Sequence, residues 1–221
     1  MVALLPVMLI VRESPRVTRT GPRLGTLAVI DQRPGLRQAL AVLIGSQGLI
    51  NVVNSATQQL VVLRLLEMLA SGVSAVTGFG FGLAGIASSA AAVLYTRVTK
   101  RYGYVPTAAA AAVLVAVAVA IIGLSPWVGV VILGVALSGL FSGVVIPATA
   151  SMIGLETPAA AQSTAFGLNA SSVALGFAIG PLVAGGVAGA TNNVSAALIV
   201  SAVLAVGLAA LIGFGAREPV R

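Results

Sequence analysis

The chain has 221 residues, of which 58% are hydrophobic and only 8% are charged, whereas a soluble domain carries about 25% charged residues. So few charged side chains cannot cover a surface that faces water. Together with a mean hydropathy of +1.09, this predicts an integral membrane protein whose solvent and partner is the lipid bilayer.

The net charge of +7 does not indicate a nucleic-acid partner, because Lys and Arg gather at the ends of apolar runs, as in membrane proteins. The sequence contains no Cys and no His. This excludes thiolate and imidazole metal sites and nucleophile pairs of the Ser-His or Cys-His type. We therefore expect no metal, no cofactor and no enzymatic activity.

The N-terminal part of the chain differs from the rest. Residues 1–11 are apolar, but 11 residues of helix span only about 16 Å of a hydrocarbon core about 30 Å thick. We expect them to be the tail of a truncated helix rather than a surface anchor. Residues 12–35 are rich in Arg and interrupted by Pro and Gly, which predicts a basic cytoplasmic connector.

Six apolar runs follow, each long enough to cross a bilayer, so the predicted fold is all-α with a six-helix transmembrane domain over residues 36–215. Residues 216–221 would form a cytoplasmic C-terminus. Four of the runs begin with a Pro in the first turn, where its missing N–H costs nothing. The expected spans are 36–63, 74–95, 106–123, 125–153, 157–190 and 194–215.

A basic stretch, Tyr95–Tyr104, is the only dense charge cluster between the spans, and we expect it to be a loop. With an even number of spans, it lies on the same side as the connector and the C-terminus. That side then holds all but one of the 12 Lys and Arg residues, the exception being Arg64 beside Glu67. The positive-inside rule predicts a plasma-membrane protein with both termini in the cytoplasm.

The first span carries four amide side chains within an arc of about 60°, namely Gln47, Asn51, Asn54 and Gln58. Amides in hydrocarbon need partners or water. Two interpretations stay open: the stripe lines a cavity on a substrate path, or it joins helices by hydrogen bonds contributing about 0.6–2 kcal/mol each.

The second, fourth and fifth spans are rich in glycine at four-residue spacing, which lets helix backbones approach closely. In the fifth span we expect packing and a bend from Gly176, Gly180, Pro181 and Gly185. The third and sixth spans hold almost only Ala, Val, Leu and Ile, so we expect them to face lipid around the other four. No carboxylate lies deep in any span.

Three features resemble the C-terminal half, helices seven to twelve, of a major facilitator superfamily transporter of the bacterial drug-efflux branch. The stretch Thr96-Arg-Val-Thr-Lys-Arg-Tyr-Gly is similar to the family's G-x-x-x-D-R-x-G loop: Arg101 and Gly103 match, while Thr96 and Lys100 replace the Gly and the Asp. The fifth span is similar to the glycine-proline pattern of antiporter helices. The basic connector resembles the one that joins the family's two halves.

This resemblance implies one half of a secondary transporter that exports drugs or small amphipathic molecules by alternating access. Its partners would be the small-molecule substrate and either a missing N-terminal six-helix half or a second copy of the chain. The basic stretch would be a cytoplasmic gate element, carried by Arg97, Lys100, Arg101 and Gly103. The alternative is a non-transporting membrane component or an inactive remnant of a transporter.

Overall fold

A computed structural model describes residues 35–218 of the protein, and within this range the chain is all-α, with no strand. The expected truncated helix 1–11, nearly all of the connector 12–35 and residues 219–221 lie outside the described residues. Each of the six helices is long and apolar enough to cross a membrane, which confirms the predicted fold class. The helices are α3 Leu36–Met68, α4 Val73–Tyr102, α5 Tyr104–Leu124, α6 Val128–Glu156, α7 Gln162–Thr191 and α8 Val194–Gly215.

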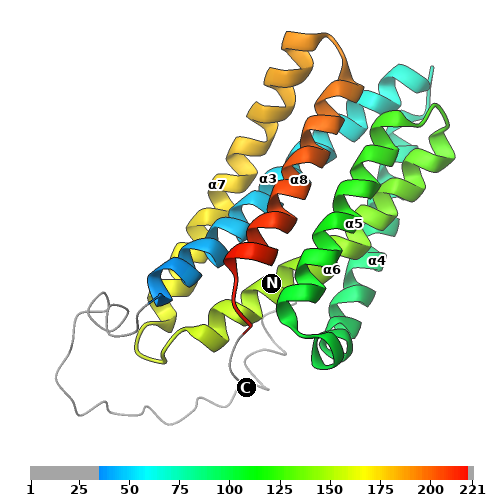
Figure 1. The fold of residues 1–221 in the computed structure, drawn as a ribbon. Helices are drawn as coiled ribbons and strands as arrows, with labels where there is room; N and C mark the ends of the chain where they lie inside the picture. Colours follow the sequence, from blue (N-terminus) through cyan, green and yellow to red (C-terminus); the bar gives the residue numbers. More distant parts are fainter. Residues whose placement is uncertain (1–34, 219–221) are drawn as a thin grey trace, which may run out of the picture.

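The helices run up and down the bundle in turn (Figure 1). α3 packs along α7, α4 packs along α6, and α5 packs along both α6 and α8. α3 also contacts α6 and α8, so it lies centrally. The start of α3 and the end of α8 therefore meet at one end of the bundle, where Gly35 and Gln38 line a small pocket with Gly215 and Arg217.

The basic stretch Tyr95–Tyr104 is not a loop, and this expectation is wrong. α4 continues through Arg97, Lys100 and Arg101 to Tyr102, and α5 begins at Tyr104. Lys and Arg are good helix formers, and in the last turn of a helix they complement its negative dipole end. The chain therefore turns from α4 into α5 at a single residue, Gly103. Its φ of +92° is one that a residue with an L side chain rarely adopts.

Glu218, just after the end of α8, contacts this α4–α5 turn. The Glu218 carboxylate accepts hydrogen bonds from the backbone N–H groups of Tyr104 at 2.6 Å and Val105 at 2.9 Å. These donors begin α5 and have no partner within their own helix. A carboxylate at a helix N-terminus also meets the positive end of the helix dipole. Glu218 thus joins the end of α8 to the α4–α5 turn.

The two most apolar helices, α5 and α8, are each partly buried within the described bundle. Of the most apolar 18-residue window, 56% is buried in α5 and 44% in α8, against 11% in α4 and 17% in α7. α5 and α8 pack closely, since a Cβ added to Gly123 of α5 would lie 2.9 Å from Leu198 Cβ of α8. In the described residues α4 and α7 are the more exposed helices, while α5 and α8 each keep an exposed apolar face that includes Val117 and Val203. That α5 and α8 face lipid around the other four stays a prediction.

We predict that Glu218→Gln will weaken the α4–α5 turn, because a neutral amide accepts weaker hydrogen bonds than a carboxylate does. In hydrogen exchange followed by mass spectrometry, peptides covering Tyr104 and Val105 should exchange several-fold faster than in the unchanged protein. Glu156→Gln, at the end of α6, is the matched control and should leave these amides unaffected. Unchanged exchange in Glu218→Gln would contradict the assignment.

Candidate functional site

The amide stripe of α3 divides into two halves with different surroundings. Gln47 is 2% exposed, and its Nε2 donates to the Ile146 carbonyl of α6 at 2.9 Å. Asn51 is also buried and donates from Nδ2 to the Gln47 carbonyl at 2.7 Å. These two amides therefore make helix contacts and are not part of the linings of the two cavities described below.

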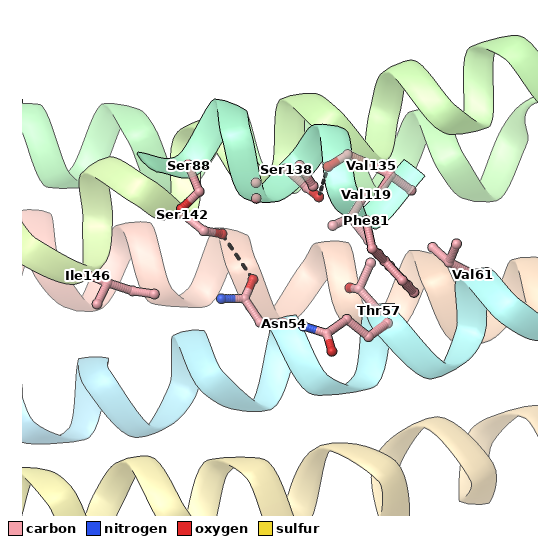
Figure 2. Close-up of a pocket in the computed structure, with 14 residues that line it drawn as sticks. Asn54, Thr57, Val61, Phe81, Ser88, Val119, Val135, Ser138, Ser142 and Ile146 are labelled. Atoms are coloured by element: carbon pink, nitrogen blue, oxygen red, sulfur yellow. Dashed lines mark hydrogen bonds between the residues drawn. The ribbon is translucent and has the colours of Figure 1, made fainter. Parts of the chain in front are cut away.

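The other two amides line a cavity of about 350 Å³ between α3, α4 and α6 (Figure 2). Asn54 Oδ1 accepts a hydrogen bond of 2.9 Å from Ser142 Oγ on α6, and Figure 2 shows this bond crossing from one helix to the other. Gln58 lies one turn further along α3. One half of the stripe thus makes helix contacts and the other half lines a cavity, while its place on a substrate path stays a prediction.

Sequence reasoning missed most of the cavity's remaining polar lining. Thr57 comes from α3, Ser88 from α4, and Ser138 and Ser142 from α6, while Phe81 of α4 adds an aromatic ring. Ser138 Oγ donates to the Val135 carbonyl at 2.8 Å, which leaves its oxygen as an acceptor. The available signal was the spacing of Ser138 and Ser142, four residues apart in a span that otherwise contains almost only apolar side chains.

The chemistry of this cavity is neutral throughout. Its polar lining consists of amides and hydroxyls, and its apolar lining includes Val61, Val119 and Val135. Among the described residues, no ionisable side chain lines it. Such a site can bind through hydrogen bonds and apolar contact, but it offers no charge to a ligand.

A second, more open cavity of about 500 Å³ adjoins the first. Gln58 and Phe81 line both cavities, so these two side chains form a shared wall. Beyond that wall the lining comes from the outer turns of α3 and from Phe177 and Pro181 of α7. The two cavities thus lie on either side of Gln58 and Phe81, one among α3, α4 and α6 and the other toward α7.

Two helix pairs with close backbone approach hold these walls in place. At the α3–α7 pair, a Cβ added to Gly176 would meet the Gly48 carbonyl and lie 2.9 Å from Asn51 Cβ, and one added to Gly180 would meet Ser55. At the α4–α6 pair, a Cβ added to Gly139 would lie 2.6 Å from the Ala84 carbonyl oxygen. Gly185, by contrast, has nothing within 4 Å. Pro181 lies inside an uninterrupted α7 and lines the second cavity.

The major facilitator superfamily model matches residues 48–221, which is most of the chain. The chain belongs to the major facilitator superfamily. Members of this superfamily are multi-pass membrane proteins that act as secondary transporters rather than as enzymes, in agreement with the six apolar helices. A comparison with curated proteins gave no significant match.

For this superfamily member we predict opposite effects of two Gly→Ala changes on α7. Gly176→Ala forces a methyl group against the backbone of α3, which should lower the free energy of unfolding by about 1–3 kcal/mol. Gly185→Ala meets open space and removes a helix-destabilising glycine, so it should be neutral or stabilising by up to about 1 kcal/mol. Thermal melts of the protein in lipid nanodiscs measure both. Equal melting temperatures would show that the α3–α7 contact is looser than described.

Proposed function

We propose that the described helices are the C-terminal half, helices seven to twelve, of a drug-efflux transporter that moves drugs or small amphipathic molecules by alternating access. The observation that carries this proposal is a neutral polar cavity, with a second cavity beside it toward α7, inside an otherwise apolar bundle. Amphipathic solutes suit a lining that combines amides and hydroxyls with Phe and Val side chains.

The missing half, or a second copy of the chain, would cover α4 and α7. Both helices expose large apolar side chains, including Phe79 and Ile86 on α4 and Leu175 and Leu182 on α7. Between them lie glycines with nothing within 4 Å, among them Gly78, Gly82 and Gly85 on α4. Small residues beside large apolar ones are typical of helix faces that pack closely in membranes. Alternating access would then be a rocking of the two halves about these faces.

The distribution of charge supports a cytoplasmic location for the end of the bundle that holds both termini. Of the described basic residues, Arg37, Arg97, Lys100, Arg101 and Arg217 lie at this end. Arg64 lies at the other end, where it pairs with Glu67 at 3.0 Å and donates to the Ser125 carbonyl at 3.2 Å. The positive-inside rule favours the orientation with Glu218 and the α4–α5 turn on the cytoplasmic side of the membrane, which we place at the plasma membrane.

The energy source would have to act elsewhere in the transporter. Among the described residues, every Asp and Glu lies at a helix end or beyond it: Glu67, Glu156 and Glu218. Proton coupling commonly uses an intramembrane acid. We therefore place the carboxylate of a proton antiporter in the half that would complete the transporter.

The cavity assignment predicts that Asn54→Leu with Gln58→Leu will lower export at least tenfold, because both side chains line the path. Export is measured as efflux of a fluorescent amphipathic dye, normalised to the amount of folded protein in the membrane.

Gln47→Leu is the control, because Gln47 bonds to the Ile146 backbone carbonyl of α6 and its own side chain is not part of the cavity lining. This change should lower the melting temperature while leaving export per folded molecule close to normal. Normal efflux in the double variant, or a loss confined to Gln47→Leu, would overturn the proposed path.

A further inference from the structure

An apolar groove of about 420 Å³ lies on the outside of the bundle, where α4 and α5 diverge from the turn that joins them. Both helices pack along α6 and make little contact with each other, so α6 forms the floor of the groove. Val98 and Tyr102 of α4 line one side, Ala110 and Leu114 of α5 line the other, and Phe141 of α6 lies between them. Val98, Tyr102 and Leu114 are exposed, so the groove opens outward.

The length and chemistry of this groove suit a hydrocarbon chain. The groove reaches from Pro106, in the first turn of α5, to Leu114, which at 1.5 Å per residue is about 12 Å along the helix. One leaflet of a hydrocarbon core is about 15 Å thick. Thr107, in the lining, donates its hydroxyl to the Gly103 carbonyl at 2.6 Å, so its proton is not available to an occupant. An occupant is therefore apolar and lies along the helices, as an acyl chain does in a bilayer.

A positive charge lies at the end of the groove nearest the α4–α5 turn. The Arg101 guanidinium carbon is 5.2 Å from the centroid of the Tyr102 ring, and that ring lines the groove. Arg101 is exposed, and among the described residues it forms no ion pair. The acid at this turn, Glu218, accepts hydrogen bonds with both oxygens from the backbone N–H groups that begin α5. An anionic group beside Tyr102 would therefore meet a cation whose charge is not neutralised within the described structure.

The groove faces a different direction from the surface that we assign to the completing half of the transporter. At 100° per residue, Val98 and Tyr102 lie about 100–160° around α4 from Phe79 and Ile86. The groove therefore stays open to lipid in the complete transporter. Its basic end is the end that we place in the cytoplasm, where the leaflet has a negative surface potential. Tyr and Arg side chains are also suited to the membrane interface, since their apolar parts lie in lipid while their polar ends reach water.

We propose that this groove binds an anionic phospholipid, with one acyl chain lying against α5 and α6 and the phosphate headgroup held by Arg101. A zwitterionic lipid binds less well, because its headgroup brings a second cation close to Arg101. The site is independent of the proposed transport function, since the groove and the cavity among α3, α4 and α6 share no lining residue.

Two lipids that share palmitoyl and oleoyl chains test the proposal: anionic phosphatidylglycerol and zwitterionic phosphatidylcholine. Each is titrated into the intact protein in detergent, and native mass spectrometry measures the affinity of the first lipid that binds. Phosphatidylglycerol should bind more tightly. Arg101→Gln should weaken its binding about fivefold, the size expected for one basic residue near anionic lipid, and should leave phosphatidylcholine binding unchanged.

Each part of the site has a matched control. Arg217→Gln removes the same charge at the same end of the bundle but outside the groove lining, so it should leave both affinities unchanged. Ala110→Phe fills the groove from an exposed position of α5 and should abolish the tight binding of phosphatidylglycerol. Val203→Phe adds a ring at an exposed position of α8 and should not affect it. Melting temperatures equal to that of the unchanged protein show that all four variants are folded.

The lipid site would be overturned by equal affinities for the two lipids in the unchanged protein. Unaltered phosphatidylglycerol binding in Arg101→Gln or in Ala110→Phe would overturn it as well. A dimer of the unchanged protein that Ala110→Phe dissociates would show that a second copy of the chain, not a lipid, occupies the groove. The transport function fails separately, by normal efflux in the Asn54→Leu, Gln58→Leu variant.

Discussion

The structure depends on the close approach of helix backbones at two pairs, α3 with α7 and α4 with α6. Lipid gives apolar helices no hydrophobic reason to associate, so the contacts must come from tight van der Waals packing and hydrogen bonds. Gly48, Gly176 and Gly180 permit the first contact, while Gly139 and Gly143 permit the second, against the backbone at Ala84 and Ser88. At these positions even a methyl group would force the backbones apart.

These contacts set the geometry of the cavity. α3 is held on one side by α7 and α6 is held on the other by α4, and the polar faces of α3 and α6 then oppose each other across the α3–α6 contact. Gln47 closes that contact with a bond to the Ile146 carbonyl, and Ser142 crosses it to Asn54. Beyond Asn54 the helices leave space that Thr57, Ser88 and Ser138 line. Asn54 and Gln58 are the amide side chains that line this space.

Much of the fold could be predicted from the sequence, since hydropathy alone locates each span to within several residues, and the glycine spacing indicates close packing. Neighbours in space could not be predicted. The helical repeat places Gln47 and Gln58 on the same face of α3. The position of α6 then determines that Gln47 is covered by α6 while Gln58 lines a cavity. A cluster of charge between apolar runs indicates a loop and so does not predict that α4 continues to Tyr102, although Lys100 and Arg101 suit a helix end. The acid that completes the α4–α5 turn, Glu218, is more than a hundred residues away in the sequence.

The central claim is that a solute-accessible polar cavity lies among α3, α4 and α6 inside the membrane. The chain has no Cys, so single cysteines report on it without background. Ser138→Cys lies in the cavity wall, and Ser201→Cys lies fully buried on α8. The rate of reaction with a small, water-soluble methanethiosulfonate reagent in native membranes compares the two. The account predicts rapid labelling at residue 138 and little labelling at residue 201. Equal rates at both positions, or no labelling at 138, would contradict it.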